Sequence, residues 1–211
     1  MIPLDIYSDP ICPWCYIGKA RLDRALESRP DHPFEIRWHP FQLNPDMPEG
    51  GMDRAKYMAL KFGDADAILA AYAPVIAAAE DTGITLNLPA ITRTPNTGDA
   101  HRLIHWAGLE GRQSAMVAAL FRAYFNEGRD IGARDSLLAL ARESGLDAAM
   151  ITRLLDTDAD AELIREANRM ARARGITGVP FFIIDQTYAV SGAQPVVVWQ
   201  NVIDELTGQS T

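Results

Sequence analysis

The only two cysteines of this 211-residue chain, Cys12 and Cys15, stand three residues apart in the segment SDPICPWCYIGKA. Random placement would give two cysteines this spacing in roughly one chain in a hundred. A Cys-x-x-Cys pair is typical of a redox-active dithiol, of half a zinc site or of a small disulfide loop, and two inert buried thiols are a further interpretation. The sequence around the pair therefore has to decide what the thiols do.

The residues on either side of the pair predict a strand followed by a helix. Apolar side chains alternate over residues 2–6, which is typical of a short strand with one buried face, and Pro10 ends it. From Pro13 onward apolar residues recur at helical spacing, and proline suits the first helical position because its missing N–H would be unpaired there. Cys12 is therefore expected at the N-cap and Cys15 one turn into the helix.

This placement predicts different chemistry for the two thiols. A helix N-terminus presents unpaired N–H groups and a partial positive charge, which favour a thiolate at Cys12. Cys15 should lie deeper and be less exposed. Cys12 is therefore expected to form a mixed disulfide with a substrate, and Cys15 to resolve it.

The other interpretations of the cysteine pair have less support. A structural zinc ion usually takes four Cys or His ligands, and the chain offers only His101 and His105 as a helical pair besides the two cysteines. A disulfide that closes so small a loop would constrain the unfolded chain little. We therefore expect a redox pair, with no metal and no organic cofactor.

Composition and charge exclude several classes of partner. The chain is 48% hydrophobic and 23% charged, as in a protein with one core, either one domain or one domain with a large insertion. Its net charge of −8 argues against nucleic acid and anionic membrane as partners. The N-terminal residues do not resemble a signal peptide, and no apolar run is long enough to span a bilayer. We expect a cytoplasmic protein.

A second segment, GVPFFIIDQTYAVSG, predicts a hairpin near the C-terminus. Residues 181–184 and 187–190 are apolar enough for two strands, although the intervening turn lacks the glycine that a tight hairpin prefers. Pro180 cannot donate to a sheet ladder, so it should lie at the first strand position or at an edge. Beyond this structural interpretation, a cis Val179–Pro180 bond would hold backbone beside the thiols.

Three segments, SDPICPWCYIGKARL, NTGDAHRLIHWA and GITGVPFFIID…YAVSGAQP, together resemble the DsbA-like thioredoxin superfamily, most closely its FrnE-like branch. The similarity runs in order across nearly the whole chain. It implies an α/β protein, a thioredoxin fold with a large all-helical domain inserted between its two halves. Residues 1–42 and 175–211 would form the thioredoxin-like domain, and residues 43–174 the insertion. Within that insertion, several amphipathic segments end in glycine, which independently indicates helices.

The resemblance also implies roles for individual residues at the thiols. Cys12 matches the exposed nucleophile and Cys15 the resolving thiol. Pro180 matches the cis proline opposite them, and the backbone of Val179 would bind an extended substrate. Pro13 matches one half of the dipeptide that tunes the redox potential.

Three further residues have a functional and a structural interpretation. Trp14, the other half of that dipeptide, could contact unfolded substrates or simply pack. Asn96 and His101 begin a helix that approaches the site in relatives, so they are candidate pocket residues. A structural role for His101 is the competing interpretation, since buried helical histidines have many uses.

The implied activity is thiol-disulfide exchange with cysteine-containing proteins or small thiols, by a monomer or homodimer, with glutathione as a candidate co-substrate. A rival is the related group of 2-hydroxychromene-2-carboxylate isomerases and kappa-class glutathione transferases. These enzymes bind glutathione and use a serine or a single thiol. They tend to carry an acidic residue in the segment where this chain has Ala193 and Gln194. A binding module without turnover would not need paired thiols. The retained pair favours the oxidoreductase.

Overall fold

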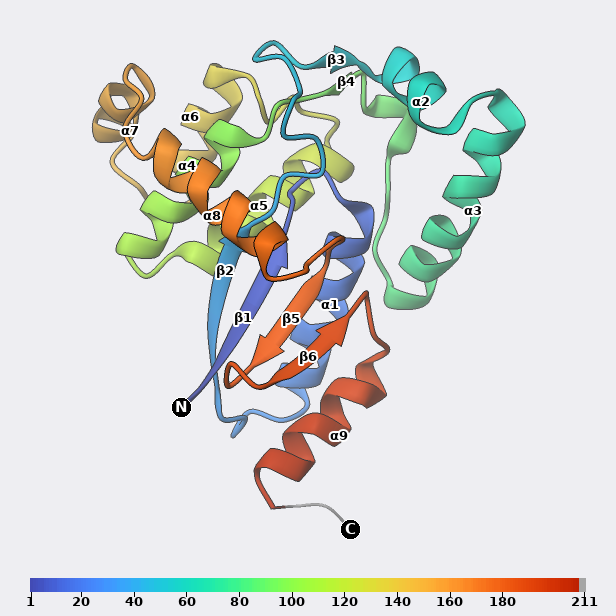
Figure 1. The fold of residues 1–211 in the computed structure, drawn as a ribbon, viewed down its shortest axis with the longest axis vertical. Coiled ribbons are helices and arrows are strands. Elements are labelled where there is room, and N and C mark those ends of the chain that lie inside the picture. Colours follow the sequence, from blue (N-terminus) through green and yellow to red (C-terminus); the bar gives the residue numbers. More distant parts are fainter. Residues whose placement is uncertain (209–211) are drawn as a thin grey trace.

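The computed structural model describes residues 1–208, and its elements follow one another as Figure 1 labels them. They are β1 (Ile2–Ser8), α1 (Pro13–Glu27), β2 (Phe34–Pro40), β3 (Met52–Asp53), α2 (Arg54–Phe62), α3 (Ala65–Thr82), a 3-10 turn (Leu88–Ala90), β4 (Arg93–Thr94), α4 (Gly98–Leu109), α5 (Gln113–Phe125), α6 (Arg134–Glu143), α7 (Ala148–Leu155), α8 (Ala161–Ala173), β5 (Phe181–Ile184), β6 (Tyr188–Ser191) and α9 (Val196–Leu206).

A four-stranded sheet in the order β2-β1-β5-β6 forms the centre of the molecule. β1 runs parallel to β2 and antiparallel to β5, so the N-terminal strand and the C-terminal hairpin meet in one sheet. Ile6 pairs with Trp38 on one side and with Phe182 on the other. The two ends of the sequence therefore build one half of the fold together.

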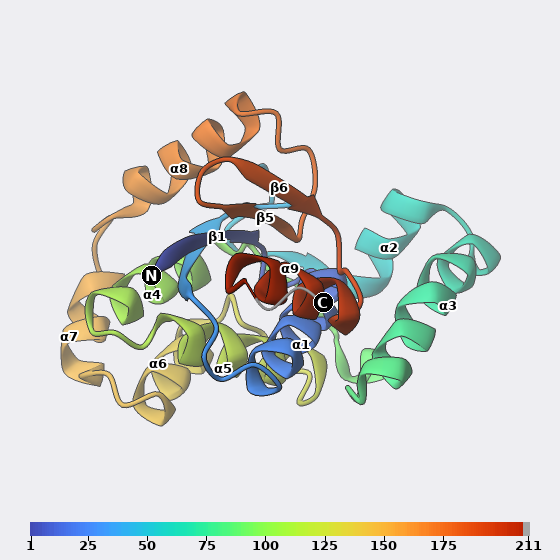
Figure 2. The same cartoon turned by 90° about the horizontal axis from the view of Figure 1, so that it is seen from below.

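The alternating pattern of β1 divides its side chains between two faces of the sheet. Leu4 and Ile6 belong to the main core, whereas Tyr7 packs in a smaller cluster with Ala171 of α8. Figure 2 shows α1 and α9 on one side of the strands and α8 on the other. Since both faces are covered, the strands contribute apolar residues to both.

The segment between β2 and β5 is helical on both flanks of the sheet. α4 packs against α5 and α8, and both α5 and α8 contact β2. α2 and α3 form an arm on the other flank, where α3 contacts α1 (Figure 1). The thioredoxin fold with a helical insertion is thus confirmed, while the division at residues 42 and 175 stays a prediction.

Two local predictions need correction. The insertion is not all helical, because β3 pairs with β4 as an antiparallel ladder of two residues each. Such a short ladder carries no periodic signal in the sequence. The last strand begins at Tyr188 rather than at residue 187, because the Thr187 N–H bonds to the carbonyl of Ile184 and belongs to the turn. Asp185 and Gln186 both take positive φ, as a type I′ turn requires even without glycine.

In residues 1–208 no single helix is long and apolar enough to cross a membrane. Only α2 and α3 taken together have the length and apolar composition of a membrane span, and these two helices are bent by 94° relative to each other.

Candidate active site

The cysteine pair lies where β1 passes into α1, as predicted. Cys12 is the N-cap residue, with an extended backbone (φ −89°, ψ 115°), and Pro13 follows as the first helical residue. The Cys12 carbonyl accepts the N–H groups of Cys15 and Tyr16. The chain thus places one thiol at the positive end of α1 and the other one turn inside it.

Cys12 is less accessible than predicted. Its exposed fraction is 4%, against 1% for Cys15, so both thiols are buried. The reason is the opposing segment before β5, where the Val179 carbonyl lies 3.5 Å from the Cys12 sulfur and accepts its S–H. The Val179–Pro180 peptide bond is cis. A substrate that reaches Cys12 therefore meets the backbone of Val179 as well.

The surroundings of Cys15 keep its proton in place. Burial raises the pKa of the Cys15 thiol well above its usual value, and its hydrogen bond with the Cys12 sulfur raises it further. The Ser8 hydroxyl faces the same sulfur and opposes this rise in pKa, although within residues 1–208 its oxygen makes no hydrogen bond. We regard the Ser8 contact as weak. The surroundings of Cys15 thus disfavour its thiolate form.

Asp9 is a buried residue in the turn between β1 and α1, and its backbone carbonyl accepts the Cys12 N–H. One oxygen accepts the Leu43 N–H at 2.7 Å, and the other accepts the Ile11 N–H at 3.4 Å. Burial raises its pKa to about 7, against the partial opposition of these hydrogen bonds. A carboxyl group that titrates near neutral pH beside a thiol pair is suited to proton transfer.

His101 of α4 completes this buried group. Its Nε2 atom lies 3.8 Å from Oδ1 of Asp9, too far for a hydrogen bond. Burial lowers the pKa of His101 to about 3, so the imidazole is neutral at physiological pH. The structure thus places the predicted pocket residue His101 beside Asp9, three residues before Cys12, and sequence reasoning missed Asp9.

One known protein family matches nearly the whole chain. The family model described as "DSBA-like thioredoxin domain" matches residues 3–204. This chain belongs to the DsbA-like thioredoxin domain family. The match confirms the superfamily that the three sequence segments resemble.

Individual DsbA-like relatives cover nearly the same length. The protein YwbO of Bacillus subtilis (strain 168) is 30% identical over 205 residues, which is 97% of this chain and 96% of YwbO. The structure of the "probable DsbA oxidoreductase SCO1869" from Streptomyces coelicolor has a TM-score of 0.86 at 33% identity, covering 100% of this chain and 92% of that one. A 2-hydroxychromene-2-carboxylate isomerase has a TM-score of 0.74 at 20% identity, covering 98% and 97%, which is a likeness of fold alone.

Gly18 is a second residue that sequence reasoning missed in this DsbA-like site. A Cβ atom at this buried position of α1 would lie 3.0 Å from Cγ of Pro180 and 3.5 Å from Cα of Ala193. The missing side chain therefore lets Pro180 approach the helix closely. The signal was a glycine inside a helix, which costs stability relative to alanine and usually has a packing reason.

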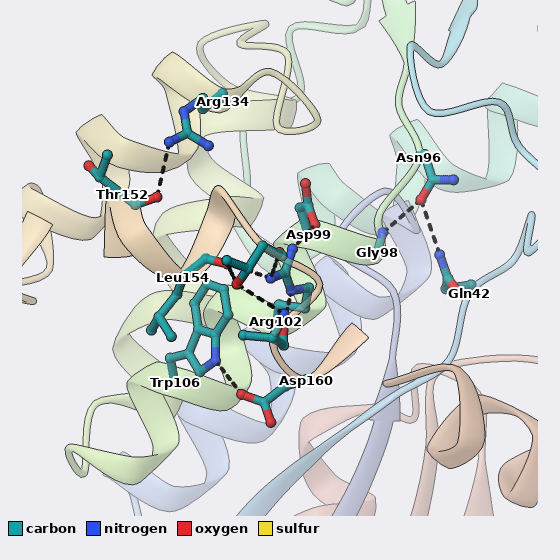
Figure 3. A network of polar contacts seen from close by, with 12 residues as sticks. Gln42, Asn96, Gly98, Asp99, Arg102, Trp106, Arg134, Thr152, Leu154 and Asp160 are labelled. Carbon is teal, nitrogen blue, oxygen red and sulfur yellow. Dashed lines mark hydrogen bonds and ion pairs between the residues drawn. The ribbon is translucent and has the colours of Figure 1, made fainter. Parts of the chain in front are cut away.

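Asn96 lies elsewhere in the DsbA-like fold. Its amide N–H donates to the Met47 carbonyl. Its amide oxygen accepts the Gly98 N–H and an N–H of the Gln42 side chain (Figure 3). Asn96 lines a cavity of about 570 Å³ beside α4 and α8, and neither cysteine is among the residues that line it within the described chain. Within residues 1–208 no hydrogen bond joins Asn96 to either cysteine, and its role as a pocket residue stays a prediction.

The same cavity is supported by a buried arginine. Arg102 of α4 is 4% exposed and donates to Asp99 and to three carbonyl groups around the end of α7, as Figure 3 shows. These carbonyls belong to Leu154, Thr157 and Ala159. Such a saturated guanidinium group stabilises the turn between α7 and α8, so we interpret it as structural.

Trp14 and Pro13, in the first turn of α1, are half-buried. Trp14 packs against the cluster that Ile17 forms with Val75 and Ala79 of α3. Packing is thus part of its role, and substrate contact by its exposed edge stays a prediction. Within residues 1–208 no group of three or more His, Cys, Asp or Glu side chains is arranged to hold a metal ion.

Proposed function

We propose that this DsbA-like protein is a thiol-disulfide oxidoreductase that exchanges a Cys12–Cys15 disulfide with cysteine-containing proteins or small thiols. The observation that carries the proposal is the stacked pair of thiols. Cys12 stands at the N-terminus of α1, and the buried Cys15 is hydrogen-bonded to its sulfur. This arrangement separates an attacking thiol from a resolving one.

The reaction proceeds through a mixed disulfide. The Cys12 thiolate attacks one sulfur of a substrate disulfide, forms a new S–S bond and releases the other substrate sulfur as a thiolate. Cys15 then loses its proton and attacks the Cys12 sulfur. This step forms the Cys12–Cys15 disulfide and releases the second substrate thiolate, so the substrate gains the two electrons that the pair loses. Run in reverse, the same steps oxidise a dithiol substrate.

The Val179 carbonyl supports substrate binding at this site. It faces the Cys12 sulfur at 3.5 Å and lies at the start of the segment that leads into β5. An extended peptide that reaches Cys12 would lie against this backbone just before β5. Cysteine-containing proteins and small thiols, glutathione among them, fit such a site. We keep the predictions of a cytoplasmic location and of no organic cofactor as part of the proposal.

A trapping experiment tests the assignment of the two thiols. We expect Cys15→Ser to accumulate mixed disulfides with a disulfide-containing protein substrate such as scrambled ribonuclease, because the attacking thiol remains and the resolving one is lost. Cys12→Ser should trap nothing. Non-reducing electrophoresis and intact mass measure the adducts. Equal trapping by both variants would contradict the asymmetry of the site.

A glutathione-dependent isomerase remains the second candidate function, because the isomerase fold covers 98% of this chain. An enzyme of that kind needs one thiol or hydroxyl at the start of α1, whereas this chain has two buried thiols in contact. Cys15→Ser separates the two functions. It should abolish turnover of an oxidoreductase and leave a single-thiol isomerase active on a chromene carboxylate with glutathione.

A further inference from the structure

A second cavity, of about 340 Å³, lies where α4, α5 and α8 meet β2, the strand at one edge of the sheet. We call it the edge pocket. Much of its wall is apolar and buried, since each of the following lining residues is at most 7% exposed: Trp38, Ile104, Val117, Phe121 and Ile164. The edge pocket is thus built like a ligand site, with apolar walls inside the molecule.

The mouth of the edge pocket is apolar as well. Leu109, at the end of α4, and Leu163 of α8 both line the pocket, although they are 74% and 48% exposed. Large apolar side chains that are exposed next to an apolar pocket are typical of a binding site. The apolar surface therefore continues from the solvent into the edge pocket.

The charged groups near the mouth are already paired within the protein. Arg37 and His39 of β2 line the edge pocket. Nη2 of Arg37 lies 2.8 Å from Oε2 of Glu35, and Nε2 of His39 lies 2.7 Å from Oδ1 of Asp5. Neither basic group is thus free to attract an anion, so the mouth favours a neutral ligand.

Two buried polar atoms form the inner end of the edge pocket. Ser8 and His101 line it and are only 6% and 3% exposed. Within residues 1–208, neither Oγ of Ser8 nor Nε2 of His101 has a hydrogen-bond partner. Buried polar atoms normally have such a partner, in the protein or in a molecule that the protein binds. These two atoms therefore indicate a polar group on the ligand.

The surroundings of His101 specify the kind of polar group. Burial lowers the pKa of His101 to about 3, so the imidazole carries no charge at neutral pH. The Asp9 carboxyl group lies 3.8 Å from its Nε2 atom and disfavours a second anion there. A hydroxyl group suits the site, because it can donate a hydrogen bond to one buried atom and accept one from another, whichever tautomer the imidazole adopts.

The size and the aromatic walls of the edge pocket indicate the rest of the ligand. An apolar cavity of about 150 Å³ holds one benzene ring. The edge pocket has about twice that volume, so two fused rings fit. The rings of Trp38 and Phe121 in its wall favour contact with another aromatic ring.

We propose that the edge pocket binds a neutral aromatic alcohol of one or two rings, with its hydroxyl group on Ser8 and His101. Within the described part of the chain, neither cysteine is among the residues that line this pocket. The site is therefore additional to the proposed thiol-disulfide exchange, and ligand binding there does not depend on that function.

Equilibrium dialysis of the whole protein tests the proposal with two probes, 2-naphthol and 2-fluoronaphthalene. Both probes have the same two rings, and in the second a fluorine atom replaces the hydroxyl group. Apolar burial alone would favour the second probe, because it is the more hydrophobic. We expect the parent protein to bind 2-naphthol about tenfold or more tightly, because only its hydroxyl group can pair with the two buried atoms.

Two alanines of α8 locate the bound probe. Ala167 lines the edge pocket, whereas Ala161 lines the 570 Å³ cavity, and both are half-buried. Ala167→Phe should fill the edge pocket and abolish saturable binding of 2-naphthol. Ala161→Phe is the matched control, with the same substitution on the same helix, and should bind 2-naphthol like the parent protein.

His101→Leu tests the polar end of the edge pocket. This variant removes one of the two hydrogen-bonding atoms, so the preference for 2-naphthol over 2-fluoronaphthalene should disappear. His101→Gln keeps a polar group there and should restore part of the preference. An unchanged preference in His101→Leu would contradict the proposed role of the imidazole.

The parent protein gives the decisive result, because the comparison of the two probes needs no variant and holds even if a substitution unfolds the chain. Equal affinity for both probes would overturn the inference, as would undiminished binding by a folded Ala167→Phe variant. An absence of saturable binding would also overturn it, since water alone would then occupy the buried atoms. Circular dichroism checks that each variant is folded.

Discussion

The buried carboxyl group of Asp9 predicts that stability falls as pH rises toward neutrality. Its pKa of about 7 in the folded protein compares with an ordinary value of 3.8. Over that interval the folded state binds a proton that the unfolded state has released, so the free energy of unfolding decreases with increasing pH. Each pH unit is worth about 1.4 kcal/mol, so the full interval amounts to about 4 kcal/mol. This stabilisation is complete below about pH 4 and lost above about pH 7.

Asp9→Asn removes this dependence, because an amide does not titrate. The amide also places an NH₂ group where a carboxylate oxygen accepts a backbone N–H from Leu43 or Ile11, at a cost of about 1–3 kcal/mol. That cost is the same at every pH. It therefore cancels when the change in free energy between two pH values is compared for the parent and the variant.

Urea unfolding of the reduced proteins at about pH 4.5 and about pH 8 measures the effect. Between these conditions the parent should lose about 3–4 kcal/mol more than Asp9→Asn. Every other titrating group contributes equally to the two proteins, so the parent is compared directly with Asp9→Asn. Parallel losses in the two proteins would refute the burial argument, since they would mean that Asp9 ionises near its ordinary pKa.

Two further substitutions test the packing around the site. Gly18→Ala should destabilise the protein by about 1–3 kcal/mol and slow exchange at Cys12, because the new methyl group meets the Pro180 ring at 3.0 Å. Gly178→Ala, whose Cβ meets nothing within 4 Å, is the control in thermal unfolding and turnover assays, and equal effects of both would contradict the contact argument. Arg102→Met should cost more than about 3 kcal/mol in urea unfolding, because three buried carbonyl groups lose their donor. A loss below about 1 kcal/mol would show that water replaces the guanidinium group.

The strand and helix around the thiols could be predicted because their signals are local. Alternating apolar residues end at Pro10, helical spacing begins at Pro13, and both signals lie within a few residues of the pair that they position. The prediction of the thioredoxin fold depended on motifs far apart in sequence. The resemblance of three segments indicated how the strands and helices come together, which hydrophobic periodicity does not reveal.

The chemistry behind the thiols could not be predicted in the same way. Asp9 and His101 are 92 positions apart in sequence and meet only because the fold places α4 beside the turn that follows β1. Amphipathic spacing assigns His101 to a helix but does not say which strand that helix faces. The burial of Cys12 could not be predicted for the same reason, since Val179, whose carbonyl covers the thiol, is 167 positions away in sequence. Asn96 is close in sequence to His101 but lines the 570 Å³ cavity, so proximity in sequence does not by itself assign the two residues to one cavity.

Equilibration in glutathione redox buffers tests the central claim most directly. Tryptophan fluorescence and the count of free thiols follow the purified protein, with Cys12→Ser as the control. The proposed function predicts one reversible two-electron transition, with a midpoint between about −120 and −270 mV, that the control lacks. Both thiols should disappear together. No transition, or glutathione retained by the parent without formation of the Cys12–Cys15 disulfide, would contradict the account and favour the isomerase.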